Sequence, residues 1–78
     1  MKLELYYYDM CPYCVMVLRK IDALGIRDQI EFKDTLSNPA HAEFHLKKTG
    51  VRTVPCLYID GKPMFESIDI IQWLSEKF

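Results

Sequence analysis

The chain has little of what marks several large classes of protein. It contains three cysteines, three glycines and four prolines in 78 residues, and its ten Lys and Arg balance eleven Asp and Glu for a net charge of -1. No apolar run is as long as the ~20 residues needed to cross a bilayer. Acidic residues also interrupt the first nine residues, where a signal peptide would be continuously apolar. The absence of a basic excess argues against nucleic-acid binding. Together these features predict a cytoplasmic protein that binds neither nucleic acid nor membrane.

The cysteines are too few, and odd in number, for a disulfide-stapled secreted domain. Two of them form the motif Cys11-Pro12-Tyr13-Cys14, and the third, Cys56, directly follows Pro55. In a reducing compartment this arrangement indicates reactive thiols or metal ligands. We expect Cys56 itself to be a small core residue, because it lies in an apolar run.

The hydrophobic pattern predicts seven secondary-structure elements in a single domain, residues 1–78. Strands are expected at residues 3–8, 30–34, 54–59 and 62–65, and helices at residues 12–24, 39–49 and from residue 67 onward. Gly25 and Gly50 end the first two helices, Asn38 caps the second, and Asp60-Gly61 is a hairpin turn. The order β-α-β-α-β-β-α predicts an α/β domain in which a parallel strand–helix–strand unit and a hairpin share one sheet, with helices on both faces.

The last helix follows the predicted hairpin. We expect Ser67 to cap it. The expected apolar positions are Ile68, Ile71, Leu74 and Phe78, with Ile70 and Trp73 flanking them.

The Cys-x-x-Cys motif falls where the first strand ends and the first helix begins. Cys11 is expected at the helix N-cap, where its sulfur can accept hydrogen bonds from the backbone N–H groups of Tyr13 and Cys14. These bonds and the helix dipole favour the thiolate, whereas the charge of Asp9 opposes it. Cys11 is therefore predicted to be the nucleophile. Cys14, one turn into the helix, is predicted to be the resolving thiol.

A zinc site is the alternative, with His41 and His45 supplying two further ligands. The separation from Cys14 to His41 is longer than in ordinary zinc fingers, and both histidines fall in a helix with its own cap. Redox chemistry without a metal is favoured. The two histidines are interpreted as solvated or half-buried helix residues.

At this point the chain resembles the glutaredoxins. The resemblance rests on Cys11-Pro12-Tyr13-Cys14 after the first strand, on Thr49-Gly50 followed by Arg52-Thr53-Val54-Pro55, and on Asp60-Gly61-Lys62. These segments cover essentially the whole chain in the family's order and spacing. The resemblance implies a thioredoxin fold with a four-stranded mixed sheet.

One departure from the glutaredoxins lies after the last strand, where Phe65-Glu66 replaces the usual Gly-Gly pair. Glu66-Ser67-Ile68-Asp69-Ile70 instead looks like the Glu-Ser motif of the glutathione transferase N-terminal domain. With Tyr8-Asp9 before Cys11, the sequence is most similar to the thioredoxin-fold N-terminal domain of two-domain, transferase-like bacterial glutaredoxins.

The resemblance also implies a binding mode for glutathione. Pro55 would follow a cis peptide bond, and the backbone of Val54 next to Thr53 would pair with the cysteine of glutathione. Ser67 would bind the γ-glutamyl carboxylate through its hydroxyl and backbone N–H, and Glu66 or Asp69 the α-ammonium. The alternative for Ser67 and Asp69 is that they are an ordinary helix cap and first-turn acid.

The glycyl end of glutathione is less well specified by the sequence. Many glutaredoxins place Lys or Arg three residues before the first cysteine, and this chain has Tyr8 there. Arg52 is the best remaining cation, although an exposed solubilising role explains it equally well. Tyr13 would pack beside the bound tripeptide or cover the helix end.

The resulting functional prediction is a monomeric glutathione-dependent thiol–disulfide oxidoreductase. Its co-substrate is glutathione, its partners are disulfide-bearing or glutathionylated proteins, and the glutathione reductase system supports it indirectly. Three alternatives remain: a redoxin reduced by thioredoxin reductase, an iron–sulfur cluster carrier that dimerises through Cys11 and glutathione, and a module that binds glutathione without catalysis.

Overall fold

A computed structural model describes all residues, 1–78, and contains every predicted element in the predicted order. The elements are β1 (Leu3–Tyr7), α1 (Pro12–Leu24), β2 (Glu31–Asp34), α2 (Pro39–Thr49), β3 (Cys56–Ile59), β4 (Lys62–Met64) and α3 (Ser67–Lys77), with an unpredicted 3-10 turn at Arg27–Gln29. The strand β3 begins two residues later than expected, because Pro55 has no N–H to donate to a ladder. None of the helices has the length and hydrophobicity needed to span a membrane.

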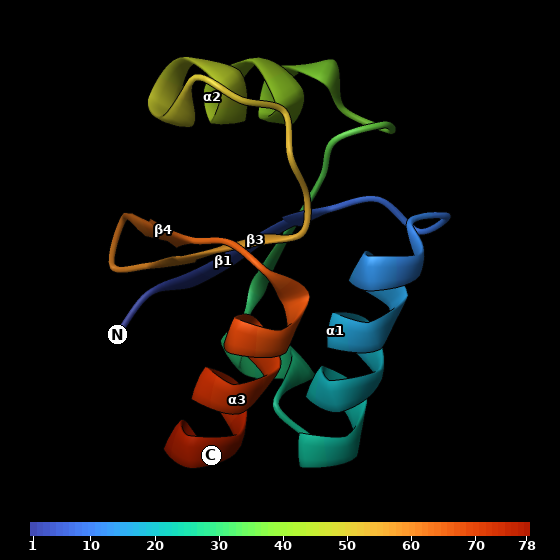
Figure 1. The fold of residues 1–78 in the computed structure, drawn as a ribbon, viewed down its shortest axis with the longest axis vertical. Helices are drawn as coiled ribbons and strands as arrows, with labels where there is room; N and C mark the ends of the chain where they lie inside the picture. Colours follow the sequence, from blue (N-terminus) through green and yellow to red (C-terminus); the bar gives the residue numbers. More distant parts are fainter.

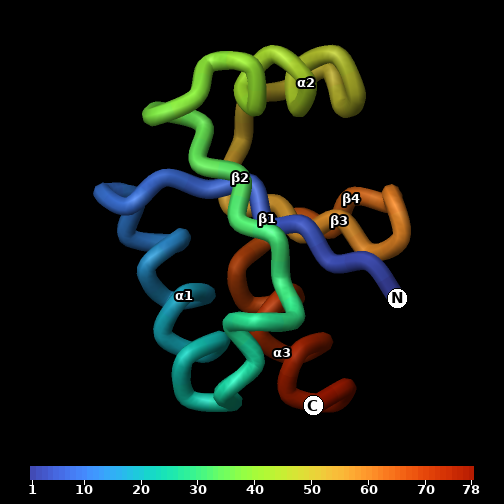
Figure 2. The backbone as a smooth tube through the Cα atoms, turned by 180° about the vertical axis from the view of Figure 1, so that it is seen from behind, coloured from blue at the N-terminus to red at the C-terminus, as the bar shows by residue number.

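The four strands form one mixed sheet in the order β2-β1-β3-β4. The pair β1–β2 is parallel, and the pairs β1–β3 and β3–β4 are antiparallel. Figure 1 shows α2 alone on one face of the sheet and α1 beside α3 on the other, and Figure 2 shows the same three layers from behind. The predicted fold, a four-stranded mixed sheet with helices on both faces in the thioredoxin arrangement, is confirmed.

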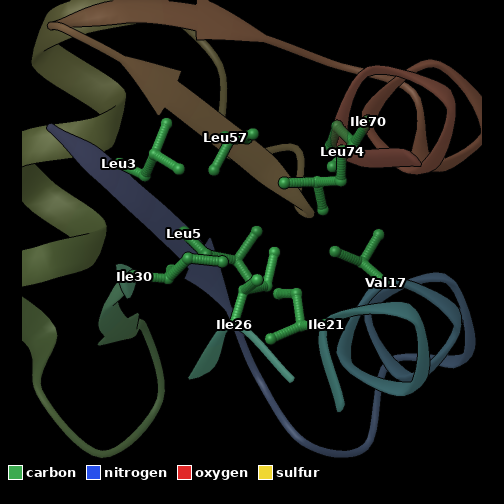
Figure 3. Close-up of a cluster of buried hydrophobic side chains, with 9 residues drawn as sticks. All are labelled: Leu3, Leu5, Val17, Ile21, Ile26, Ile30, Leu57, Ile70 and Leu74. Atoms are coloured by element: carbon green, nitrogen blue, oxygen red, sulfur yellow. The ribbon is translucent and has the colours of Figure 1, made fainter. Parts of the chain in front are cut away.

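The main core lies between the sheet and the layer of α1 and α3, as Figure 3 shows. Its nine buried side chains are Leu3, Leu5, Val17, Ile21, Ile26, Ile30, Leu57, Ile70 and Leu74. Alternate residues of β1 point to opposite faces of the sheet, so Leu3 and Leu5 enter this core whereas Tyr6 faces α2. Each fully buried aliphatic side chain contributes about 1.5–3 kcal/mol relative to an exposed one.

The predicted apolar face of α3 is confirmed at Leu74 and Ile71 and wrong at Ile68 and Phe78. The helix buries Ile70 and Leu74, whereas Ile68 is 70% exposed and Phe78 is 41% exposed. Ser67 is the first helical residue, and Glu66 occupies the N-cap without a side-chain capping bond. The sequence contains two overlapping apolar stripes, and packing against α1 and the sheet selects the one through Ile70.

A second buried cluster, formed by Tyr6, Cys56 and Tyr58, lies on the α2 side of the sheet. Cys56 is fully buried, which confirms it as a core residue, and burial raises the pKa of its thiol to about 12. His45 of α2 packs into this cluster and is only 1% exposed. The expectation that His45 is solvated or half-buried is therefore wrong, because aromatic rings of the sheet surround it.

Candidate functional site

The candidate site lies where the end of β1 meets the beginning of β3. These strands are antiparallel, with Tyr6 opposite Cys56, so the residues that follow β1 lie beside those that precede β3. Cys11 thereby meets a segment more than 40 residues away in sequence: its thiol donates to the backbone carbonyl of Val54 across 4.0 Å. The next peptide bond, Val54-Pro55, is cis, as the resemblance implied.

Cys11 occupies the N-cap of α1, as predicted. Its extended backbone (φ -76°, ψ 119°) and Pro12 at the first helical position begin the helix there. The Sγ atom accepts a hydrogen bond from the backbone N–H of Cys14 at 3.4 Å, whereas the second predicted bond, from Tyr13, is absent. With 6% of its surface exposed, Cys11 is shielded from bulk water on most sides.

Cys14 is completely buried, whereas 6% of the surface of Cys11 is exposed. Burial is the main reason that its pKa is raised to about 12, and the neighbouring Cys11 and Asp9 raise it further. At neutral pH Cys14 is therefore a protonated thiol and a poor attacking group. The raised pKa of Cys14 is consistent with Cys11 as the thiol that attacks first.

A hollow of about 380 Å³ lies next to Val54, the residue that Cys11 contacts, between the segment that precedes β3 and the N-terminus of α3. It is lined by Tyr13, Thr53, Val54, Pro55, Glu66, Ser67 and Ile68. Six of these seven residues were predicted from the sequence. Ile68 was missed as a lining residue because it was placed in the core.

The N-terminus of α3 presents unpaired hydrogen-bond donors to this hollow. The first helical bond runs from the N–H of Ile70 to the carbonyl of Glu66, so the N–H groups of the residues before Ile70 have no intrahelical acceptor. Glu66 has a positive φ (φ 69°, ψ 114°), which a non-glycine residue rarely adopts. The Ser67 hydroxyl makes no hydrogen bond within the chain, and Ser67 is 8% exposed. A helix N-terminus with free donors suits a carboxylate.

A second hollow, of about 230 Å³, lies on the other side of Val54. Arg52 lines this one, together with Tyr8, Thr35, Leu36, Ala42, His45 and Val54. Of the remaining predicted site residues, Asp69 is exposed in the first turn of α3 and lines neither hollow. Leu36 and Ala42 carry no sequence signal for this position, which depends on how α2 sits over the sheet.

The zinc alternative does not fit this geometry. The structure contains no group of three or more His, Cys, Asp or Glu side chains that could hold a metal. Both ring nitrogens of His45 are engaged, one with the Tyr58 hydroxyl at 2.8 Å and one with the Thr53 carbonyl at 2.7 Å. His45 therefore has no lone pair directed at the cysteines.

Comparison with known proteins gives a consistent set of matches. A family model described as the N-terminal domain of glutathione S-transferase matches residues 5–78. A curated glutaredoxin from Ricinus communis is 40% identical over 53 residues, which are 67% of this chain and 52% of that protein. The chain thus spans about half the length of this relative.

Two solved structures show the same similarity in three dimensions. An epsilon-class glutathione S-transferase from the housefly, Musca domestica, superposes with a TM-score of 0.80 at 32% identity, over 99% of this chain and 35% of that one. A glutathione transferase homologue from Drosophila mojavensis, solved with bound glutathione, gives a TM-score of 0.80 at 26% identity, over 99% of this chain and 35% of that one.

Proposed function

Because this chain belongs to the family of glutathione S-transferase N-terminal domains, we propose that it uses glutathione, and specifically that it reduces disulfides and glutathione mixed disulfides. The observation that carries the proposal is the placement of Cys11. Its thiol lies at a helix N-terminus, against the Val54 carbonyl, with a second thiol one turn behind it. A module that only binds glutathione requires neither thiol.

In the proposed reaction the Cys11 thiolate attacks the glutathione sulfur of a mixed disulfide. A Cys11–glutathione disulfide forms, and the other thiol of the substrate leaves with a proton from solvent. The thiolate of a second glutathione then attacks the glutathione sulfur on Cys11, which releases oxidised glutathione and restores the Cys11 thiolate. In this monothiol route Cys14 stays protonated throughout, as its raised pKa favours.

Protein disulfides would follow a second route. Cys11 forms a mixed disulfide with the protein, and the Cys14 thiolate attacks the Cys11 sulfur. The reduced protein leaves, and two glutathione molecules reduce the Cys11–Cys14 disulfide in turn. The rim of the site suits protein substrates, because Met10, Tyr13 and Ile68 are 84%, 63% and 70% exposed and can contact apolar side chains.

The two hollows suggest how glutathione lies across Val54. The γ-glutamyl carboxylate would enter the larger hollow, where Ser67 and the N-terminus of α3 offer donors. Glu66 would take the α-ammonium, since Glu66 lines this hollow and Asp69 does not. The glycyl carboxylate would point to the smaller hollow, toward Arg52. Cytoplasmic location, a monomeric state and support by glutathione reductase belong to the same proposal.

The test is turnover of a small glutathione mixed disulfide, coupled to glutathione reductase and NADPH. Wild type and Cys14→Ser are expected to be active, and Cys11→Ser inactive. An inactive wild type that is instead reduced rapidly by thioredoxin reductase would replace the proposal with the redoxin alternative. A brown protein on anaerobic purification would favour the iron–sulfur carrier.

A further inference from the structure

The segment between α2 and β3 carries Val54 but has almost no backbone support. Residues 51–55 take part in none of the backbone–backbone hydrogen bonds of the turns, loops and caps. Side chains hold this segment instead. Thr49 bonds to the N–H and carbonyl of Val51 at its start, and Cys11 makes a long contact of 4.0 Å to Val54 at its end. The short bond in the middle, 2.7 Å, joins His45 to the Thr53 carbonyl.

The chemistry of this bond shows which ring nitrogen of His45 carries a hydrogen. A carbonyl oxygen accepts and does not donate, so Nε2 must carry a hydrogen. In the neutral ring Nδ1 is then an acceptor, and it receives the hydrogen of the Tyr58 hydroxyl at 2.8 Å. Tyr58 is 1% exposed in β3, so a rigid strand supports the ring from behind.

Packing restricts the orientation of the same ring. Tyr6 stacks on the His45 ring at 5.4 Å between centroids and 21° between planes, and Phe65 lies 5.8 Å away. His45 is also nearly inaccessible to water. The Nε2–H group is therefore a fixed donor directed at one atom of the segment.

The bond to Thr53 has a geometric consequence for Val54. The Thr53 carbonyl and the Val54 N–H belong to one trans peptide group, in which C=O and N–H point in opposite directions. By holding the carbonyl on the α2 side, His45 directs the Val54 N–H away from α2. This N–H has no acceptor within the chain.

We propose that His45 is a positioning residue that holds the Thr53–Val54 peptide with its N–H directed at the backbone of the bound substrate. The inference rests on the proposed function for the identity of that substrate, glutathione or a glutathione-like disulfide. His45 does not touch the reacting sulfurs. It acts by fixing the orientation of a peptide group whose carbonyl it binds and whose N–H, that of Val54, has no acceptor within the chain.

The experiment compares His45→Leu, His45→Gln and a matched control, His41→Leu, in steady-state turnover of a glutathione mixed disulfide. His41 lies one turn earlier in α2 and bonds to Asn38 rather than to the segment. We expect KM to rise about tenfold or more in His45→Leu, because a carbonyl loses its partner and the peptide becomes free to rotate. His45→Gln, which keeps an N–H donor, should recover most of the wild-type KM, and His41→Leu should match the wild type.

Two further measurements separate positioning from general structural damage. Alkylation of Cys11 by iodoacetamide, which needs no contact with Val54, should stay within about twofold of wild type in all three variants if the fold is intact. NMR order parameters of Thr53 and Val54, measured without glutathione, should fall from about 0.85 toward about 0.6 in His45→Leu. If His45→Leu does not fold, Tyr58→Phe, which removes the hydrogen bond to Nδ1, replaces it and is expected to show a smaller rise in KM.

A folded His45→Leu with wild-type KM and unchanged order parameters would overturn the inference. A rise in KM that His45→Gln does not reduce would also overturn it, because steric loss rather than the hydrogen bond would then be the cause. A wild type that fails to turn over glutathione mixed disulfides would refute the proposed function alone. The order parameters would still decide whether His45 holds the segment.

Discussion

The buried thiol of Cys14 gives a quantitative prediction about how a mixed disulfide on Cys11 is resolved. Resolution requires the Cys14 thiolate, and burial is the largest of the causes that raise its pKa to about 12. Once Cys11 is in a disulfide, its charge and its hydrogen bond no longer oppose ionisation of Cys14. The pKa then falls, but burial remains, so it stays above the neutral range.

The size of the effect follows from the titration of one group. With the pKa of about 12 that Cys14 has beside the free Cys11 thiol, only about one Cys14 in 10⁵ is ionised at pH 7. In the mixed disulfide this fraction is larger, and it still rises about tenfold with each pH unit below the pKa. A thionitrobenzoate mixed disulfide can be formed on Cys11 at pH 5 and then brought to pH 6.5–9.5 by rapid mixing. We expect the logarithm of the rate of release of the coloured thiol to increase with a slope of about 1 through neutral pH, with no plateau near pH 7.

Cys14→Ser is the control and should release no coloured thiol in this phase. Cys56→Ser should behave as wild type, because Cys56 is equally buried and belongs to the core. A rate that levels off near pH 7 would refute the reasoning, since Cys14 would then already be ionised at that pH despite its burial.

Three further predictions test the fold and the binding site. Ile70→Ala should lower the free energy of unfolding by about 2–5 kcal/mol and its neighbour Ile68→Ala by at most about 0.5 kcal/mol, measured by denaturant titration, because Ile70 is fully buried and Ile68 is 70% exposed. Ser67→Ala should raise KM for a glutathione mixed disulfide about tenfold or more, as expected for the loss of one hydrogen bond to a carboxylate, with the iodoacetamide reactivity of Cys11 unchanged. The N–H groups of Ser37 and Leu36 lower the pKa of Asp34, so its stabilising effect is present above the unfolded pKa of about 4 and is lost as pH falls through the folded value. Asp34→Asn should accordingly lower the melting temperature at pH 7 and should lose that difference in acid.

The parts of the fold that the sequence predicted are those governed by local signals. Pro12, Asn38 and Gly25 mark helix ends through backbone geometry that is the same in any protein, and the structure has the helices at those positions. The position of Cys11 could also be predicted from the sequence, because its motif lies at a strand–helix junction.

The sequence did not predict the features that depend on tertiary packing, which decides which side chains of a helix become buried. In α3 both Ile68 and Ile70 continue an apolar stripe, and only contact with α1 and the sheet selects Ile70. His45 is polar and belongs to a helix with a weakly apolar face, so only the aromatic rings of β1 and β3 show that it is buried. The second hollow also depends on tertiary packing, since Leu36 and Ala42 reach it from separate segments.

The direct pairing of β1 with β3 has a consequence for how this site can change during evolution or design. The register of these two strands, in which Tyr6 lies opposite Cys56, brings the segments that carry Cys11 and Val54 to the same end of the sheet. The connection from β2 to α2 has no part in that register. Insertions or substitutions near Leu36 can therefore reshape the smaller hollow while Cys11 stays beside the segment that carries Val54.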